Sequence, residues 1–435
     1  MNIRSTLKRF PPLGGTAAEL KTLQLKGLQW TVSHAYNNSD FYGERLDSVG
    51  IRPEDIKRIE DVARLPFTTA EDLRKEYPFP LRAADLTDIV RIHSSSGTTG
   101  KRKILSYTQK DLDDWAYMFG RCYEMAGVTR EDRVQICVGY GLWTAGAGFQ
   151  TGCERFGALA IPAGPGNMEL QCTLLVDMQS TVVCSTASMA LLLAEEVHRR
   201  NLQDKINLKK VILGAERSSN AMIRKIKNLL GIEEVYDITG LTEVYGPGTG
   251  LSCKYNNGIH YWADFYILEI LDPDTLTPVR PGDIGEMVFT TLHKEGSPLI
   301  RYRSRDLTRM IPDNCPCGCL LPRHDKILGR SDDMFIFRGV NVYPGQIEEV
   351  FSEVTGVGSE YQAHLEHRAD GRDYMTLKVE RDGNIHESGD KGLIEAISIK
   401  LKRKLMVSAT IEIVPYGSLP RSEKKTTRVF DKRTY

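Results

Sequence analysis

The chain has 435 residues, a length that suits two or three domains and a large buried core. Hydrophobic residues make up 41% and charged residues 26%, and the 57 Lys and Arg residues balance the 57 Asp and Glu residues. This balance gives no field that would attract nucleic acid or an anionic membrane surface. The first residues lack the apolar core of a signal peptide, and no run of about 18 apolar residues suggests a membrane span, so we expect a cytoplasmic protein.

A run of small polar residues, HSSSGTTGK at 93–101, is the first candidate functional element. Glycines and hydroxyl side chains allow backbone N–H groups to converge on an anion, so such a loop can hold a phosphate. A Walker loop needs glycine where Ser95 stands and Ser or Thr where Arg102 stands, so the run is not a Walker loop. From these residues alone, a solvated surface turn is an equally good interpretation.

From about residue 130, apolar runs of strand length alternate with segments of helical spacing, which is typical of a parallel α/β sheet. The expected strands are RVQICVGYG at 133–141, ALAIPAG at 158–164, TVVCS at 181–185, KKVILG at 209–214 and EEVYDITG at 233–240. The expected helices are AGAGFQTGCERFG at 145–157, SMALLLAEEVHRRN at 188–201 and NAMIRKIKNLLG at 220–231.

After residue 250 the pattern changes to alternating strands, including FYILEIL at 265–271 and GEMVFTTL at 285–292. Turn signals between them predict a small antiparallel β-subdomain over about residues 250–325. Near residue 330 a polar turn precedes a short strand and a helix start. We therefore divide the chain into a large domain, 1–329, and a small α+β domain, 330–435, which ends in a basic tail.

Several motifs fall in the order and spacing of the adenylate-forming enzymes, the superfamily of acyl-CoA synthetases and firefly luciferase. They are SSSGTTGK at 94–101, YDITGLTE at 236–243, IRYRSRD at 300–306 and LGRSDD at 328–333. Within that superfamily the chain resembles the phenylacetate–CoA ligase family through GYGLWTAGAG at 139–148, GAE at 214–216, CPCG at 315–318, RGVNVYP at 338–344 and SLPRSEKKTTRVFDKR at 418–433. The resemblance implies an α/β fold: a large N-terminal domain with mainly parallel sheets sandwiched by helices, a small β-subdomain and a mobile C-terminal α+β lid domain.

The resemblance implies a two-step ligase that uses ATP with Mg²⁺ and coenzyme A to activate an aryl acid, phenylacetate or a close analogue. The carboxylate attacks the α-phosphorus and releases pyrophosphate, and the CoA thiol then displaces AMP. Another acid such as indoleacetate, or another acceptor, stays open, because some relatives load a carrier protein or stop at an adenylylated product, as coenzyme F390 synthetases do. A nucleotide-binding protein without turnover is the alternative of a different class. We expect no nucleic-acid or membrane partner, and a homodimer stays open.

The resemblance assigns the nucleotide site to three stretches. The loop residues Ser94, Ser95, Ser96, Gly97, Thr98, Thr99, Gly100 and Lys101 would hold the departing phosphates. Gly214, Ala215, Glu216, Asp237, Ile238 and Thr239 would surround the adenine. Asp306 would accept hydrogen bonds from the ribose hydroxyls, although by itself it could equally form a salt bridge with a neighbouring arginine.

The resemblance also assigns the residues that would stabilise charge during the reaction. Mg²⁺ usually takes one or two carboxylates plus substrate phosphates, and the resemblance makes Glu243 that ligand and Thr242 a contact of the α-phosphate. It makes Lys425 the group that stabilises the adenylation transition state, with Lys424 where relatives carry glycine. It places the catalytic Arg330, with Asp332, at an interdomain hinge, and Gly339 towards the CoA side.

For the acid itself, Tyr140 and Trp143 beside Gly141 and Ala147 offer an aromatic wall next to small residues, which can form a slot for a planar ring. Packing of a helix start in the core explains any one of these residues equally well. Relatives usually carry phenylalanine where Trp143 stands, and the larger indole would narrow or reshape the slot.

Cysteines cluster at 315–319, downstream of Cys253 and His260. Three thiolates and an imidazole would complete a tetrahedral structural zinc site, and the resemblance selects Cys253, His260, Cys315 and Cys317. Cys319 is then either a spare thiol or a competing ligand. Reduced cysteines in a loop are the alternative, but three within five residues are rarely without a role in a cytoplasmic protein.

Overall fold

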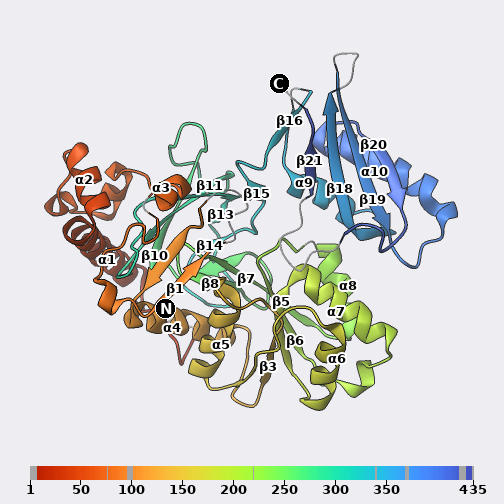
Figure 1. Cartoon of the computed structure of the whole chain (residues 1–435), viewed down its shortest axis with the longest axis horizontal. Helices are drawn as coiled ribbons and strands as arrows, with labels where there is room; N and C mark the ends of the chain where they lie inside the picture. The colour runs from red at the N-terminus through yellow and green to blue at the C-terminus, as the bar shows by residue number, and fades with distance from the viewer. Residues whose placement is uncertain are drawn as a thin grey trace. The chain divides into compact units, whose positions relative to one another are not determined.

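The computed structural model describes residues 7–75, 77–95, 101–218, 220–338, 340–367, 372–420 and 428–433. The chain divides into two compact units, Met1–Ala215 with Leu229–Ile327, and Glu216–Asn228 with Leu328–Tyr435 (Figure 1). The second unit thus takes in a segment, 216–228, that the sequence analysis places in the first domain. The boundary at residue 330 stays a prediction.

The first unit is built on a nine-stranded sheet in the order β13-β14-β9-β8-β7-β6-β5-β3-β4. Its strands are β3 (Arg133–Ile136), β4 (Leu159–Ile161), β5 (Val182–Thr186), β6 (Lys210–Gly214), β7 (Glu234–Leu241), β8 (Gly246–Ser252), β9 (Ile259–Tyr261), β13 (Met310–Ile311) and β14 (Arg323–His324). From β4 to β7 neighbouring strands are parallel, which confirms the expected α/β pattern. Beyond β7 they are antiparallel, because β8 returns beside β7 after a short turn and not after a helical crossover.

The three helices expected at 145–157, 188–201 and 220–231 form as α5 (Thr144–Phe156), α7 (Ala187–Arg199) and α8 (Asn220–Leu230), and most of α8 belongs to the second unit. The first unit also contains α4 (Gln109–Met125) and α6 (Met168–Asp177), which the sequence analysis does not predict. Helices α4 and α5 contact each other and β8, whereas α7 packs on β5, β6 and α6 (Figure 1). Helix α5 ends at Gly157, whose φ of 89° is the left-handed conformation of a helix C-cap. None of the described helices has the length and apolarity that crossing a membrane requires.

A second, antiparallel group of strands follows in the chain. It contains β10 (Tyr266–Leu271), β11 (Gly285–Thr291) and β12 (Tyr302–Thr308). The stretch expected to form one β-subdomain is therefore divided, because β9 pairs with β8, β14 with β9 and β13 with β14, and these strands extend the large sheet. Helix α1 packs on β11, where Thr31 Oγ1 donates to Thr291 O at 2.9 Å.

The N-terminal part supplies the remaining elements of the first unit. They are α1 (Ala17–Asn38), α2 (Asp40–Ser48), α3 (Ala70–Lys75), the hairpin of β1 (Arg91–Ser94) with β2 (Ile104–Tyr107), and the short 3₁₀ helices η1 (Pro53–Asp55), η2 (Ile59–Arg64), η3 (Leu86–Asp88) and η4 (Gln203–Lys205). The polar run at 93–101 begins in β1 and lies between the two strands of that hairpin.

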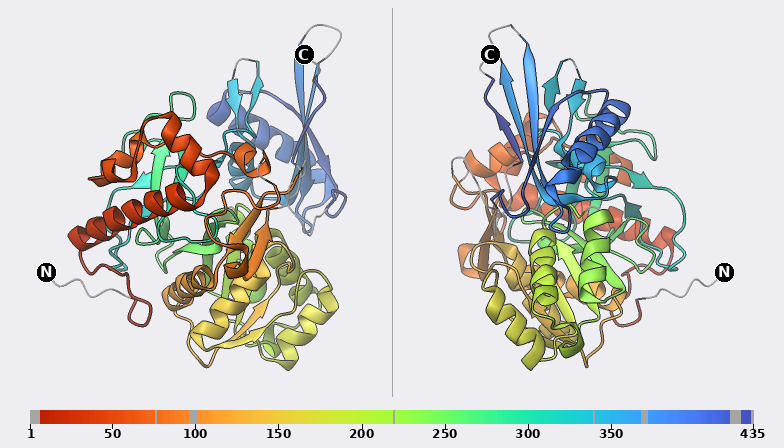
Figure 2. Two further views of the ribbon diagram at one scale, coloured as in Figure 1. Left: turned by 60° about the vertical axis from the view of Figure 1, so that its left-hand side comes forward. Right: turned by 90° about the vertical axis from the view of Figure 1, so that its right-hand side faces the viewer.

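The second unit has the expected α+β organisation. Its sheet has the order β20-β19-β18-β21, in which the long central strands are antiparallel and each outer strand is parallel to its neighbour. The elements are β15 (Gly329–Arg330), β16 (Phe335–Phe337), β17 (Val340–Val342), α9 (Pro344–Ser352), β18 (Val357–His367), β19 (Asp373–Arg381), η5 (Glu387–Gly389), α10 (Asp390–Leu405), β20 (Thr410–Val414) and β21 (Val429–Asp431). Helix α10 lies along one face of this sheet (Figure 2), and Leu377 and Ile397 are fully buried between them.

A buried ion pair fastens α4 to the segment before β10. Arg121 donates to both carboxylate oxygens of Asp264 at 2.7 and 2.6 Å, and both side chains are 0% exposed. The same guanidinium donates to the carbonyls of Phe10 and Pro11, and Asp264 accepts from Leu13 N. These contacts also hold the N-terminal strap, residues 10–13, against α4.

We expect Arg121→Met to lower the free energy of unfolding by about 3–5 kcal/mol, because it leaves the Asp264 carboxylate buried without its cation. All four tryptophans lie in the first unit, so their fluorescence in a urea titration reports on that unit.

The matched control is Arg199→Met, which breaks an ion pair with Glu196 in which the arginine side chain is 68% exposed. It should leave the same free energy almost unchanged, because water screens an exposed ion pair. Equal losses in the two variants would contradict the role assigned to Arg121.

Candidate active site

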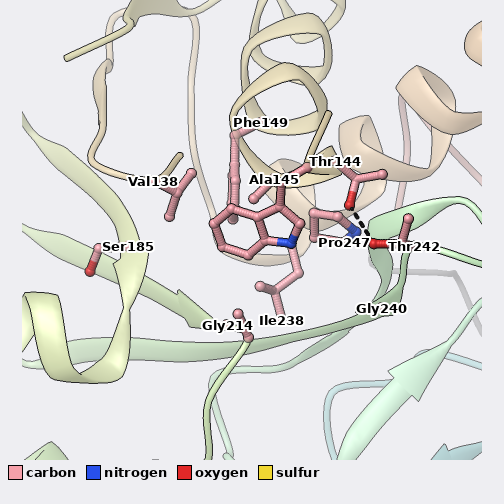
Figure 3. Close-up of a pocket in the computed structure, with 12 residues that line it drawn as sticks. Val138, Thr144, Ala145, Phe149, Ser185, Gly214, Ile238, Gly240, Thr242 and Pro247 are labelled. Carbon is pink, nitrogen blue, oxygen red and sulfur yellow. Dashed lines mark hydrogen bonds between the residues drawn. The ribbon is translucent and has the colours of Figure 1, made fainter. Parts of the chain in front are cut away.

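A pocket opens at the carboxyl ends of β5, β6 and β7, beside the start of α5 (Figure 3). Its lining consists of Val138, Trp143, Thr144, Ala145, Phe149, Ser185, Gly214, Ala215, Ile238, Gly240, Thr242 and Pro247. The empty volume is about 410 Å³, including the part open to solvent. Open parallel sheets bind ligands at this edge, and the mostly apolar lining with a few hydroxyls suits a small organic ligand.

The floor of the pocket depends on close approach of two backbones. A Cβ atom at Gly214 would lie 2.6 Å from Ile238 Cγ2, so no larger residue fits between β6 and β7. Ala215 follows with φ of 66°, in the left-handed region. The two residues leave a flat surface formed by the backbone, the environment expected for a planar ring.

Three of the six residues expected near adenine line this pocket: Gly214, Ala215 and Ile238. Side chains alternate along a strand, so Asp237 and Thr239 lie on the opposite face of β7 from Ile238. Asp237 forms an ion pair there with Lys326 at 2.8 Å. Glu216 belongs to the second unit.

The turn after β7 carries Thr242 and Glu243. The hydroxyls of Thr242 and Thr144 lie 3.2 Å apart at the rim of the pocket (Figure 3). Glu243 is buried, with a side chain 6% exposed, and its Oε1 accepts hydrogen bonds from Lys103 Nζ and, at 3.2 Å, from Tyr302 OH. Burial alone would raise the pKa of Glu243, but the Lys103 charge and these hydrogen bonds outweigh it and lower the pKa.

A second lysine, Lys294, is buried and supports the turn that carries Glu243. Lys294 Nζ donates to the backbone carbonyl of Glu243 at 3.1 Å and lies over the rings of Tyr107 and Tyr245, 4.8 and 5.1 Å from their centroids. Burial lowers the pKa of Lys294 to about 8, although Asp111 and Glu243 raise it.

The sequence analysis missed Lys103, Lys294 and Tyr302. Lys103 lies two residues beyond the polar loop, and its pairing with Glu243 depends on a contact across 140 residues of chain. No motif marks Lys294, because its partners are aromatic rings and a carbonyl supplied by other elements.

The ends of the polar loop are described, whereas Ser96, Gly97, Thr98, Thr99 and Gly100 lie outside the described residues. Ser94 N donates to Leu142 O at 2.7 Å, and Ser95 N donates to Lys103 O at 3.3 Å. These bonds place the start of the loop next to the residues that precede α5. Lys101 Nζ lies 5.5 Å from the ring centroid of Tyr77.

Asp306 lies on β12 and is 9% exposed. The nearby arginines form ion pairs with glutamates of the neighbouring strands: Arg301 with Glu269, and Arg303 with Glu286. These pairings weaken the alternative in which Asp306 serves as their salt-bridge partner. Its contact with ribose stays a prediction.

The remaining expected site residues belong to the second unit. Arg330 forms a two-bonded pair with Asp332, with donor–acceptor distances of 2.9 and 3.0 Å, inside the polar turn. Gly339, Lys424 and Lys425 lie outside the described residues. The hinge and catalytic roles of these positions stay predictions.

Trp143 is the only one of the four residues expected in the aryl-acid slot that appears in the lining of this pocket. It lines the pocket together with Phe149 and Ile238. Tyr140 instead packs its ring on Gly146, where a Cβ would lie 2.6 Å from the ring, and Gly141 and Ala147 do not line the cavity. Whether these three contact the acid stays a prediction.

Four metal-ligating side chains converge away from this pocket. One donor atom from each of Cys253, His260, Cys315 and Cys317 lies within 4.8 Å of the other three. Cys253 Sγ is 3.5 Å from Cys315 Sγ, and Cys317 Sγ is 3.3 Å from His260 Nε2. His260 Nδ1 lies 2.9 Å from Leu321 O, a contact that orients Nε2 towards the sulfurs. Cys319 contributes its backbone N–H to Cys317 Sγ at 3.4 Å.

Comparison with known proteins identifies the class. A family model described as AMP-binding enzyme matches residues 28–293, and one described as AMP-binding enzyme C-terminal domain matches 339–433. Crystal structures of 2-hydroxyisobutyryl-CoA ligase are similar at 27% identity. The postadenylation state in complex with 2-HIB-AMP has a TM-score of 0.90 and covers 98% of this chain and 92% of its own. The complex with 2-HIB-AMP and CoA in the thioesterification state has a TM-score of 0.71 and covers 97% and 91%.

The chain is thus an adenylate-forming, AMP-binding enzyme. Phenylacetate–coenzyme A ligase of Escherichia coli K12 is 40% identical over 422 residues, 95% of each chain. The ligases of Pseudomonas putida and Thermus thermophilus are 39% and 37% identical and cover 95% of this chain. The chain belongs to the phenylacetate–coenzyme A ligase family.

His93, the first residue of the polar run, should make the stability of the protein depend on pH. It is 2% exposed, its Nδ1 lies 3.2 Å from Leu142 O, and its Nε2 makes no hydrogen bond among the described residues. Burial lowers the pKa of His93 to about 4, against the hydrogen bond to Leu142, which raises it. The folded protein therefore favours neutral His93, and the unfolded chain binds a proton more readily below about pH 6.5.

As the pH falls from about 6.5 to about 4, protonation of His93 in the unfolded chain should lower the free energy of unfolding. The His93→Asn variant should lose less free energy of unfolding over this pH range than the parent. Asparagine keeps a donor near the Nδ1 position but takes up no proton. Urea midpoints of parent and variant, followed from pH 7.5 to pH 4.5, measure this difference. Parallel pH profiles of the two proteins would contradict the prediction.

Proposed function

We propose that the chain is an acid–thiol ligase that joins an aryl acid, phenylacetate or a close analogue, to coenzyme A with cleavage of ATP to AMP and pyrophosphate. The observation that carries the proposal is the pocket: an aromatic compartment around Trp143 borders directly on Thr242, next to the buried Glu243. An acid held there would have its carboxylate at the charged rim. Membership of the phenylacetate–coenzyme A ligase family supports this substrate class.

The nucleotide would lie along the carboxyl ends of β6 and β7. Gly214 and Ala215 would receive the flat adenine against their backbone, and Asp306 would accept from the ribose hydroxyls. Ser94 to Lys101 would hold the β- and γ-phosphates. Lys425 would stabilise the charge that develops as the acid attacks the α-phosphorus, the kind of electrostatic stabilisation that dominates many such reactions.

The residues present fit Mg²⁺. The carboxylate of Glu243 is a hard oxygen ligand of the type that Mg²⁺ prefers, and its neighbour Thr242 lines the pocket. Bound between this carboxylate and the phosphates, the cation would reduce their negative charge. Thr242 would orient the α-phosphate by hydrogen bonding.

The cysteine cluster fits Zn²⁺. Three sulfurs and one imidazole nitrogen at mutual distances within 4.8 Å match the donor set and size of a tetrahedral structural site. Four protein ligands leave no open position, so the metal would fasten the loop at 315–319 to β9 and take no part in the reaction. Cys319 would support the site through its backbone N–H.

The first test is carboxylate-dependent exchange of labelled pyrophosphate into ATP, with Mg²⁺ and without CoA, over a panel that includes phenylacetate and indoleacetate. We expect exchange with an aryl acid and, on adding CoA, formation of the thioester and AMP. Lys425→Ala should lower exchange by at least about a hundredfold, because it removes transition-state stabilisation. Trp143→Phe should shift the preference towards bulkier acids, because it replaces the indole in the pocket lining with a smaller ring.

The proposed first step would be contradicted if pyrophosphate exchange required CoA. It would also be contradicted if protein shown to bind ATP gave no exchange with any acid. Thioester formation absent after normal exchange would instead point to a different acceptor. Arg199→Met, on the exposed face of α7, is the control and should exchange like the parent.

Purified protein should contain about one zinc per chain, and Cys317→Ser should lose it, because three of the four ligands bind zinc much more weakly. Cys319→Ser keeps the backbone N–H and should retain the metal. Metal content by plasma mass spectrometry and thermal unfolding of the three proteins measure both effects. Zinc retained in Cys317→Ser but lost in Cys319→Ser would contradict this ligand set.

A further inference from the structure

Lys103 pairs with the carboxylate that the proposed function assigns to a divalent cation. Its Nζ donates to Glu243 Oε1, and the two side chains are 17% and 6% exposed. Tyr302 OH donates to the same oxygen at 3.2 Å. The ion pair is thus held inside the protein, where screening by water is weak.

Lys103 also lies at the base of the polar loop. It immediately precedes β2, and its backbone carbonyl accepts from Ser95 N at 3.3 Å, which ties together the two ends of the run at 96–100. Its side chain then reaches the turn after β7. One residue therefore links the base of the loop to Glu243.

An ammonium group and Mg²⁺ compete for such a carboxylate. Mg²⁺ requires oxygen ligands at about 2.0–2.1 Å in near-octahedral geometry. An ammonium on Oε1 occupies one of the two oxygens and repels a divalent cation at short range in a medium of low dielectric constant. Without either cation, the buried carboxylate would have no cation in direct contact, and only Lys294, held on the backbone carbonyl of Glu243, would remain nearby.

We infer that Lys103 is a positioning residue: it is the internal counter-ion of Glu243 when no nucleotide is bound, and Mg²⁺ with ATP displaces it. The inference rests on the proposed function, in which Glu243 binds the metal. Lys103 balances the charge of the carboxylate before the cation arrives, and it raises the concentration of divalent cation needed to occupy the site.

The test uses Mn²⁺, whose free concentration is read by electron paramagnetic resonance, with α,β-methylene-ATP, which cannot be adenylated. Lys103→Met and Lys103→Gln should bind Mn²⁺ about threefold more tightly or better than the parent, because a nearby positive charge is gone. Without nucleotide, Lys103→Met should unfold at a lower urea concentration than the parent. Replacing a lysine with a merely structural role would lower both the Mn²⁺ affinity and the resistance to urea. A higher Mn²⁺ affinity together with a lower resistance to urea therefore identifies Lys103 as the counter-ion.

Arg102→Met is the matched control, since it removes the same charge one residue away, where Arg102 contacts Ser94 Oγ at 3.5 Å. It should show neither effect. Lys103→Gln keeps a hydrogen-bond donor for Glu243 and serves if Lys103→Met does not fold. The inference is overturned if the Lys103 variants bind Mn²⁺ no more tightly than the parent. It is also overturned if Arg102→Met raises the Mn²⁺ affinity by the same factor.

Glu243→Gln separates this inference from the proposed function. If Glu243→Gln binds Mn²⁺ as tightly as the parent, the metal assignment itself fails. If Glu243→Gln binds Mn²⁺ weakly while the Lys103 variants match the parent, only the role of Lys103 fails.

Discussion

A charged carboxylate buried at the end of β7 needs compensation, and the surroundings of the pocket are arranged to supply it. Glu243 receives Lys103 from the loop hairpin, Tyr302 from β12 and, on its backbone carbonyl, Lys294 from the connection before β12. Lys103 is far along the chain from Lys294 and Tyr302, and the hairpin of β1 and β2 belongs to a different sheet from β12. The need to keep Glu243 ionised thus joins the loop hairpin, the large sheet and the antiparallel strands at one point.

The backbone of the turn that carries Glu243 is also fixed by hydrogen bonds. Tyr107 OH on β2 lies 3.1 Å from Thr242 O and 2.9 Å from Tyr245 O, bridging the two sides of the turn. Because β8 returns antiparallel directly after this turn, the chain has no long loop here in which the carboxylate could move. A site that must present one oxygen to a cation benefits from such support.

Much of the fold followed from local pattern, and much of the site did not. The runs TVVCS and KKVILG became β5 and β6 because strand length and flanking turns are properties of the local sequence. The close contact of Gly214 with Ile238 was not predicted, because it depends on how two strands pair. The division of the β-rich stretch between two sheets was missed because strands of two or three residues carry almost no pattern. Lys103 and Lys294 were missed because their partners are distant in sequence.

The two lysines at Glu243 differ in the kind of acceptor they satisfy, and this decides what each can do. Lys103 is 17% exposed and acts on the carboxylate, the one group nearby that a divalent cation can also bind. Lys294 is fully buried, lies over two tyrosine rings and donates to a backbone carbonyl of the turn. Lys294 therefore fixes where the carboxylate stands, and Lys103 holds its charge until a ligand replaces it.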